Sequence, residues 1–343
     1  MDGLFINDTR TQDELKLISF SNYKKTSVCS ELTKSIINGK IEESSNWVAE
    51  LVCSGHFIDI WEIIISVVSR NIHAGNPKLP IYISVRISEF KNIVNSGYGN
   101  NIIGLRNNER IRILFSEIIT ILCESSKKHA IKSDIKVDKS ELTLTNIQDK
   151  LCSPDFTQTN CFIVGDPKDL FIFSNEFAYA LKSKNMMMSC YWVDWLIEYS
   201  VKVSKIQPRD CQEVHKTNQS DTIWLVWDIL TEQVNLANDK LAIKIIESLK
   251  IIFCLKYSKG MSRKRKYLMY FAISIITELY DHTIPIVKNK DTVDLVTSKL
   301  HIIYKSIKKS ENNPQVTLND KDKTTSNTMK RIKLLNKIDN LIY

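Results

Sequence analysis

The sequence predicts an all-α or nearly all-α protein with two packed multi-helix halves and a mobile basic C-terminal tail. Of 343 residues, 9 are glycine and 7 are proline, whereas these two residues average roughly 12% of globular chains. This deficit disfavours turn-rich sandwiches and barrels and Gly-rich nucleotide-binding sheets. Apolar residues make up 43% and charged residues 25%, so the chain can bury a core. The apolar residues recur at helical spacing, and paired helices permit a repeat-like array.

The first half is predicted to span residues 28–123, after a loosely ordered N-terminus at 1–27. Two of its helices end at Gly39 and Gly55, because glycine adopts the left-handed conformation after a helix at little cost. Residues 79–87 fit either a strand or a helix, since isoleucine is β-branched. The predicted helices of this half cover residues 31–38, 41–54, 56–71 and 108–123, the third being apolar almost all round and therefore central.

The second half is predicted at residues 161–309, after a polar stretch at 124–160 that forms a linker or an irregular excursion. Asp166 is expected to be the N-cap of its first helix, with Pro167 as the first helical residue. Its predicted helices cover residues 168–182, 186–203, 221–234, 239–257, 262–280 and 292–309. Residues 310–343 are expected to be mobile, apart from a short terminal amphipathic helix marked by Ile332, Leu335, Ile338 and Leu341.

Neither a metal site nor a membrane span is expected. The eight cysteines include no pair at the C-x2–4-C spacing of zinc sites, and no H-x3–5-H pair occurs. The longest apolar runs have about eleven residues, too few to cross a bilayer. Scattered cysteines without an N-terminal signal sequence indicate a reducing compartment. We therefore expect a cytoplasmic protein without a cofactor, whose oligomeric state stays open.

The basic residues are unevenly distributed along the chain. Residues 256–343 hold 18 Lys/Arg and 8 Asp/Glu, a net charge of +10, whereas the remainder has −2, because the total is +8. Such asymmetry is typical of proteins that bind a polyanion. Lysine (37) far outnumbers arginine (10), whose planar guanidinium favours specific base and phosphate recognition. Nucleic-acid contact is therefore expected to be non-specific, and a lysine-rich solubilising surface is the alternative.

The most strongly basic segment spans residues 256–267 and contains no acid. Its cations, which are the predicted anion-binding residues, are Lys256, Lys259, Arg263, Lys264, Arg265 and Lys266. Ser262 is predicted to cap the next helix, so several cations fall in the first turn, where they oppose the helix dipole. A cluster of charges that destabilises its own helix suggests that these charges serve a function. Phosphate binding at a helix N-terminus fits, as do an acidic protein partner and cations at a core edge.

Two W-x-x-W pairs occur in the second half, at residues 192–195 and 224–227. A spacing of three places both indoles of a pair on one helical face. Such indoles suit a platform for stacked bases. Each pair lies in a stripe of Ile, Leu and Val, however, and this favours an aromatic core.

The best isolated polar cluster is a loop after the predicted central helix, with His73, Asn76 and Lys78. Loop structure is the simpler interpretation. An unrecognised enzyme site near His73 and Asp166 is an alternative, and it requires these two residues to meet in one pocket. The chain lacks the sequence motifs of P-loop, serine-hydrolase and zinc-protease sites.

Several stretches resemble an uncharacterised family of helical proteins in nucleocytoplasmic large (giant) DNA viruses. They are residues 47–61 (WVAELVCSGHFIDIW), the loop 72–82 with GNPKLP, and residues 192–198 and 253–278. Ile, Asn and Lys supply 47, 26 and 37 residues, and their A/T-rich codons agree with such a source. The resemblance implies a viral protein of the cytoplasm or viral factory, and it brings no catalytic residues. Residues 34–51, with Gly39, Glu42 and Trp47, are also similar to the helical collar of clamp-loader-type ATPases, at the level of fold alone.

These observations predict a non-enzymatic helical binding module that contacts nucleic acid, or an assembly that processes it as in DNA replication, through the basic C-terminal region. One alternative is a virion structural or scaffold protein that recognises an acidic protein partner. The other is the enzyme with a site near His73 and Asp166.

Overall fold

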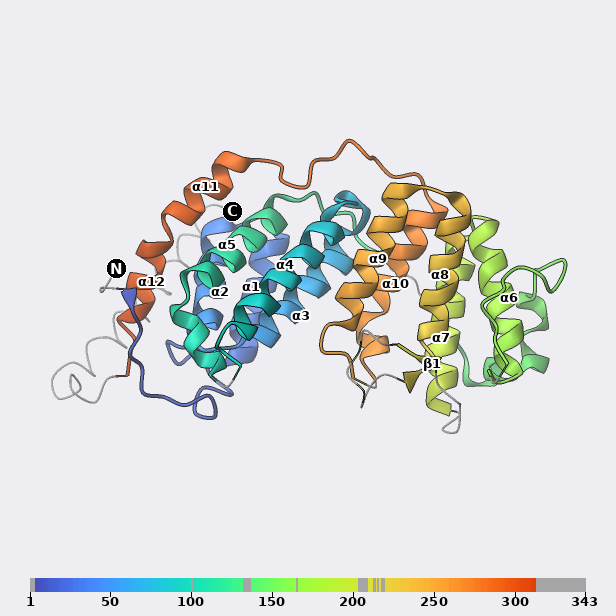
Figure 1. The fold of residues 1–343 in the computed structure, drawn as a ribbon, viewed down its shortest axis with the longest axis horizontal. Coiled ribbons are helices and arrows are strands. Elements are labelled where there is room, and N and C mark those ends of the chain that lie inside the picture. The colour runs from blue at the N-terminus through green and yellow to red at the C-terminus, as the bar shows by residue number, and fades with distance from the viewer. Residues whose placement is uncertain are drawn as a thin grey trace, which may run out of the picture.

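The structure is a computed structural model of the 343-residue chain. It describes residues 4–99, 101–131, 137–164, 166–202, 209–211, 214, 216, 220–258 and 260–312. Within these ranges twelve α-helices form the fold, and the named strands are limited to one short hairpin (Figure 1). The predicted all-α class is therefore confirmed. The predicted terminal helix of the tail lies outside the described residues.

The helices of the first half follow the predicted order. They are α1 (Lys25–Ile37), α2 (Ile41–Cys53), α3 (Phe57–Val67), α4 (Leu79–Asn95) and α5 (Glu109–Glu124). Residues 79–87, which fit a strand or a helix by sequence, are helical. Pro80 lies in the first turn of α4, where its missing N–H costs nothing. Asn108 caps α5, since its side chain accepts a hydrogen bond from the Ile111 N–H.

The second half holds the next set of helices. They are α6 (Asp169–Lys182), α7 (Met186–Lys202), α8 (Trp224–Ala237), α9 (Lys240–Cys254) and α10 (Met261–Thr277). A two-residue antiparallel hairpin, β1 (Arg209–Asp210) and β2 (Ser220–Asp221), precedes α8. The consecutive pairs α6/α7, α8/α9 and α9/α10 pack against each other, and α10 also packs on α7.

Two predicted helix caps are wrong. Helix α6 begins at Asp169, and its N-cap Lys168 makes no side-chain cap. Asp166 instead accepts a hydrogen bond from the Ile163 N–H, so it stabilises the preceding turn. Helix α10 begins after Gly260, whose φ of 88° only glycine adopts at little cost. Ser262 is therefore not its cap and lies inside the first turn.

The last two helices leave the second half, contrary to the predicted boundary at residue 309. We call residues 281–312 the C-terminal strap, and it contains α11 (Lys290–Ser298) and α12 (Leu300–Lys308). The strap crosses back over the molecule, so that α11 packs on α5 and α12 on α2 and α5 (Figure 1). Its buried apolar side chains are Val293, Tyr304 and Ile307. The predicted single helix over 292–309 is broken at Lys299 because α12 follows a different surface.

The N-terminal residues 4–24 are packed rather than loosely ordered, which corrects the expectation for residues 1–27. Ile6, Leu15 and Phe20 are buried. Arg10 makes a buried ion pair with Asp8 at 2.6 Å. The Asp8 carboxylate also accepts a hydrogen bond from the Asn312 N–H at 2.8 Å. The N-terminal segment therefore fastens the end of the C-terminal strap to the first half.

The described part of the predicted linker is an excursion that packs on the second half. Between residues 137 and 160 it forms short 3-10 turns. Trp195 Nε1 donates a hydrogen bond to the Glu141 carbonyl at 2.8 Å. The Glu176 carboxylate accepts hydrogen bonds from the Cys152 and Ser153 N–H groups. These contacts hold the excursion on α6 and α7.

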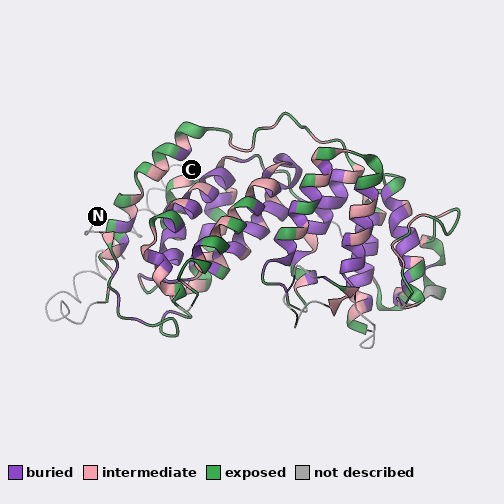
Figure 2. Ribbon diagram, in the orientation of Figure 1, coloured by how far each residue is buried: buried purple, intermediate pink, exposed green. Residues whose placement is uncertain are grey.

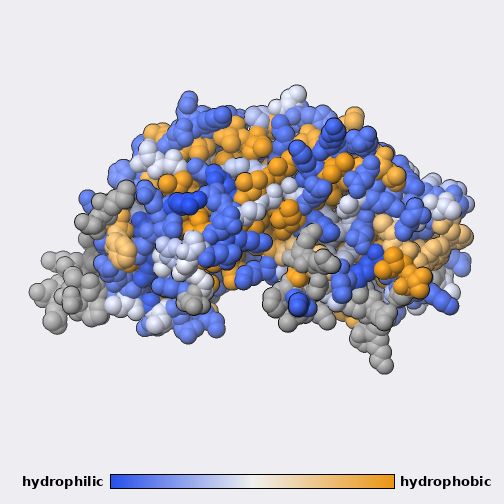
Figure 3. Space-filling model, viewed as in Figure 1, coloured by the Kyte–Doolittle hydropathy of each residue, from blue (hydrophilic) through white to orange (hydrophobic). Residues whose placement is uncertain are grey.

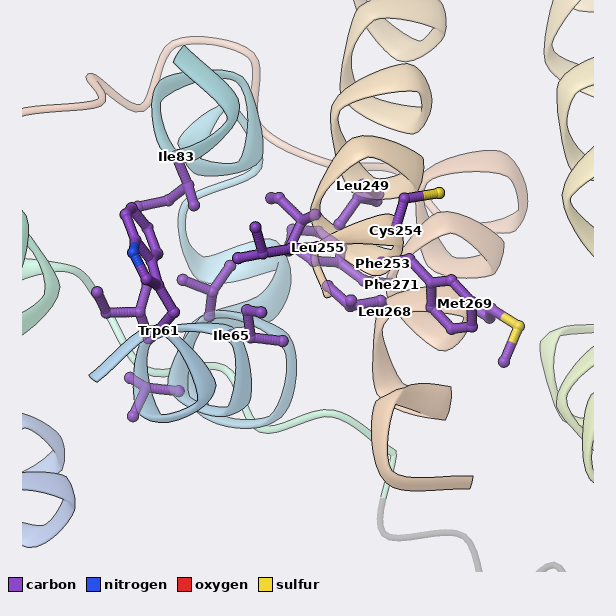
Figure 4. Packing of buried hydrophobic residues seen from close by; sticks show 14 of the residues in the cluster. Trp61, Ile65, Ile83, Leu249, Phe253, Cys254, Leu255, Leu268, Met269 and Phe271 are labelled. Atoms are coloured by element: carbon purple, nitrogen blue, oxygen red, sulfur yellow. The ribbon is translucent and has the colours of Figure 1, made fainter. Parts of the chain in front are cut away.

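One hydrophobic core runs through both halves. Helix α4 packs on α9, and the α3 region packs on α10. Figure 4 shows Ile65 on the side of α3 toward Leu255 and Leu268, whereas Trp61 lies beside Ile83 of α4. The buried residues form a continuous band through both halves in Figure 2. The halves are therefore parts of one helical array.

Both tryptophan pairs belong to this core. Trp192, Trp195, Trp224 and Trp227 are at most 2% exposed. The core interpretation of the W-x-x-W spacing is therefore confirmed, and these indoles are not available for stacked bases.

The outer surface is mixed. On the face shown in Figure 3, hydrophobic side chains lie in separate groups among hydrophilic ones. Among the described helices, none combines the length and apolar content needed to cross a membrane. In the same residues no group of three or more His, Cys, Asp or Glu side chains is placed to hold a metal ion.

Candidate functional site

The structure separates the members of the predicted basic cluster. Lys256 is exposed just after α9, with a positive φ of 49°. Lys259 lies outside the described residues. Arg263, Lys264, Arg265 and Lys266 all lie in the first turns of α10. Because successive helical residues point in different directions, these last four reach two different neighbouring helices.

All four cations of α10 form ion pairs within the chain. Arg263 pairs with Glu198 of α7 at 2.6 Å, and Lys266 pairs with Asp194 of α7 at 2.9 Å. Lys264 and Arg265 both pair with Glu62 of α3. We call these seven residues the junction ion cluster, and it joins α3 and α7 to α10. The expectation of a free phosphate-binding surface here is therefore corrected.

Arg265 is the most deeply buried member of the junction ion cluster, with 2% of its surface exposed. Its Nη1 donates hydrogen bonds to the Phe253 and Leu255 carbonyls, both at 2.6 Å, at the end of α9. Its Nη2 donates to Glu62. Burial acts to raise the pKa of Glu62, but Arg265 and Lys264 outweigh it and hold that pKa below its usual 4.5. Arg265 therefore links α3, α9 and α10 in a charged network.

The α7 side of the junction ion cluster is equally well satisfied. Lys266 Nζ donates to both carboxylate oxygens of Asp194 at 2.9 Å. Tyr270 OH also donates to Asp194, at 2.7 Å. Asp194 and Glu198, which lie one turn apart on α7, therefore both bind cations of α10.

The predicted polar loop is part of the packing between the first half and the C-terminal strap. Asn76 Nδ2 donates to the Ile286 carbonyl at 3.1 Å, and Lys78 Nζ donates to the His282 carbonyl at 2.9 Å. His73 is 2% exposed and stacks on Phe271, with ring centroids 4.5 Å apart. These contacts give the loop a structural role.

Acid should destabilise the packing around His73. Burial lowers the pKa of His73 from 6.5 to about 4, and the nearby Lys128 ammonium acts in the same direction. The unfolded chain therefore binds the proton more readily, and stability is lost as the pH falls from 6.5 through 4. The loss should reach about 3 kcal/mol, at 1.36 kcal/mol per pKa unit.

The measurement is the free energy of unfolding in urea between pH 7 and 4. His73→Asn is the comparison, because asparagine tolerates positive φ and does not titrate. Burial also lowers the pKa of His56, which acts equally in both proteins. Identical pH slopes for the variant and the unmodified chain would contradict the assignment.

The enzyme alternative is not supported by the positions of its two residues. Asp166 pairs with Arg209, which also binds Asp228 of α8. His73 contacts Phe271 and the backbone of Tyr270 on α10. The contacts of the two residues have no member in common, so the described structure does not bring them into one site.

A cationic face that the sequence analysis did not single out lies on α12. We call it the α12 lysine face, and its residues are Lys299, Lys305, Lys308 and Lys309. Among the described residues none of them forms an ion pair, and residues 299–310 contain no acid. At 100° per residue the four lysines occupy the half of the helix opposite Leu300, Ile303, Tyr304 and Ile307.

The signal for this face is present in the sequence. Apolar residues at 300, 303, 304 and 307 alternate with lysines in an acid-free run. This run holds four lysines in twelve residues, against six cations in the twelve residues of 256–267, and the partners of that denser run come from remote helices. Counting charges along the chain therefore favours residues 256–267 over α12.

Fold and surface together define an all-α array protein with an internal ion network between α3, α7 and α10 and a lysine-bearing outer face on α12. No protein-family model, curated protein or solved structure matches the chain. The resemblance to helical proteins of large DNA viruses, and the weaker likeness to clamp-loader collars, therefore stay predictions.

Proposed function

We propose that the chain is a non-enzymatic helical binding module that contacts nucleic acid, or an assembly carrying it, through the α12 lysine face. The observation that carries this proposal is a set of four lysines that form no ion pair with any described residue, on a helix docked to the body. The basic C-terminal region thus keeps its proposed role. The contact surface differs from the predicted one.

The chemistry of the face suits a phosphate backbone. Lys299 and Lys309 are ten residues apart, about 15 Å along a helix, so the row can follow several phosphates. Lysine is a point charge without base-reading geometry. Tyr304, the one Phe, Tyr or Trp of α12, is buried, so α12 offers no large exposed ring for stacking on single-stranded bases. Non-specific binding to duplex nucleic acid fits best.

One observation favours the second candidate, an acidic protein partner. Ile302 on α12 and Leu295 on the preceding helix α11 are 57% and 53% exposed. Apolar side chains between cations add nothing to phosphate binding, but they suit a protein interface with an acidic rim. A structural or scaffold role in a virion belongs to this candidate. Under either candidate, we propose a location in the cytoplasm or viral factory, a reducing compartment, on the basis of the viral resemblance alone.

Replacing the four lysines of the α12 lysine face by serine should flatten the salt dependence of duplex DNA binding. Each lost phosphate contact reduces the slope of log affinity against log salt by roughly 0.9, so four contacts account for about 3.6. The measurement is a fluorescence-anisotropy titration with duplex DNA at several salt concentrations. RNA and heparin titrations in parallel test whether the site distinguishes polyanions.

The matched control replaces four exposed lysines on other elements, Lys16, Lys91, Lys240 and Lys244, by serine. It removes the same charge and should leave most of the slope intact. An unchanged slope for the α12 variant, or the same loss for both variants, would reject the α12 lysine face as the contact surface.

A further inference from the structure

A cavity of about 670 Å³ opens at one end of the second half. Its floor is formed by Leu181, Val234, Ala242 and Ile275, which are at most 4% exposed. The volume lies within the range of ligand and side-chain pockets. None of these residues belongs to the junction ion cluster or to the α12 lysine face, so the cavity is a separate surface.

The rim of the cavity is apolar and exposed. Leu236 at the end of α8 is 69% exposed, and Leu279 after α10 is fully exposed at 100%. Exposed large apolar side chains beside an apolar floor mark an interaction surface. A bound apolar segment would remove both leucines from water.

Electrostatics at the cavity favours a positively charged occupant. The last turns of α6, α8 and α10 all contribute lining residues, and each helix C-terminus carries about half a negative charge. The carboxylates of Asp239 and Glu278 also line the cavity. Lys182 and Lys184 equal these carboxylates in number, and all four groups have partners: Lys182 donates to Gln158, Lys184 donates to the Ile276 carbonyl at 2.6 Å, Asp239 caps α9, and Glu278 accepts from Ser274. The helix C-termini therefore set the sign of the local charge. The Lys184 contact shows that an ammonium group is held at the end of α10.

We propose that this cavity receives the C-terminal segment of the chain, residues 329–341. The segment carries apolar residues at a constant spacing of three, namely Ile332, Leu335, Ile338 and Leu341. The same segment carries four cations, with Lys330 and Arg331 before Ile332 and Lys333 and Lys337 after it, against the single acid Asp339. Apolar side chains match the floor and rim, and the cations match the helix ends. The 19 residues from 313 to 331 extend to at most about 65 Å.

The test uses a fluorescent synthetic peptide of residues 329–343 and the full-length chain. Leu335→Lys and Ile338→Lys in the chain disable its own segment and leave the cavity open. Peptide binding to this tail variant should be saturable. Binding to the unmodified chain should be at least tenfold weaker, because its own segment competes.

A second pair of variants tests the cavity itself. Leu236→Lys and Leu279→Lys, added to the tail variant, should weaken peptide binding at least tenfold. Leu17→Lys and Leu295→Lys, at exposed leucines elsewhere, add the same charge and should leave it unchanged. Equal peptide binding by the tail variant and the unmodified chain would overturn the proposal. Peptide binding that is unchanged by Leu236→Lys and Leu279→Lys would also overturn it.

Discussion

Replacing Arg265 by alanine should lower the free energy of unfolding by about 3–5 kcal/mol, the usual cost of removing one partner from a buried ion pair. The variant leaves the Phe253 and Leu255 carbonyls without their charged donor. It also leaves Glu62 with Lys264 alone. Because these groups come from α3 and α9, the loss should weaken the junction between the two halves.

Arg263→Ala is the matched control for this prediction. It removes the same type of side chain from the same helix, but its ion pair with Glu198 is solvent-exposed. Exposed pairs contribute about 0–1 kcal/mol. Urea unfolding measures both variants, and Arg265→Lys adds a charge-preserving test of the guanidinium fork. Equal costs at positions 263 and 265 would show that Arg265 does not join the halves.

Most helices could be predicted because their signals are local. The turns at Gly39 and Gly55, and the start of a helix near residue 108, are read from a few neighbouring residues. The apolar spacing within each helix is equally local. Where a helix begins depends on short-range backbone geometry. The predicted caps at Asp166 and Ser262 are wrong because Lys168 and Gly260 occupy the two N-cap positions.

The path of the C-terminal strap could not be predicted, because it depends on long-range packing. Apolar periodicity shows that α12 has an inner face, but not which helices cover it. Arg112 and Tyr304 are far apart in sequence, yet the guanidinium lies 4.2 Å from the ring centroid. The hydrogen bond from the Asn312 N–H to the Asp8 carboxylate joins residues 304 positions apart. Sequence order therefore places the strap in the wrong half.

The internal ion pairs of the candidate site could not be predicted for a related reason. Counting charges along residues 256–267 considers only residues that are close to one another in the sequence. Arg265 and its partner Glu62 are 203 positions apart, and Lys266 and Asp194 are 72 apart. The unfavourable charge at the start of α10 is real, but carboxylates from other helices offset it. A dense cationic run thus indicates either a ligand site or an internal ion network, and only tertiary structure distinguishes them.

Tyr304→Ala should release the C-terminal strap and leave the rest of the core folded. Tyr304 is one of few buried side chains of the strap, is 2% exposed, and contacts Arg112 of α5. Truncating a buried aromatic residue costs about 3–5 kcal/mol. A strap held by so few buried side chains opens as a local unit when one is lost. Hydrogen exchange across residues 290–312 should then accelerate roughly hundredfold or more, while exchange at the α3–α10 junction stays unchanged.

Ile302→Ala is the control, because Ile302 lies on the same helix with 57% of its surface exposed and should change exchange little. Tyr304→Phe separates the ring from the hydroxyl and should preserve most protection. The same variants connect the strap to the proposed function. If α12 holds its lysines in a fixed row, Tyr304→Ala should weaken duplex DNA binding without removing any charge. Full DNA affinity with an unprotected strap would mean that the lysines act through charge alone, and that the docked geometry of α12 has no part in recognition.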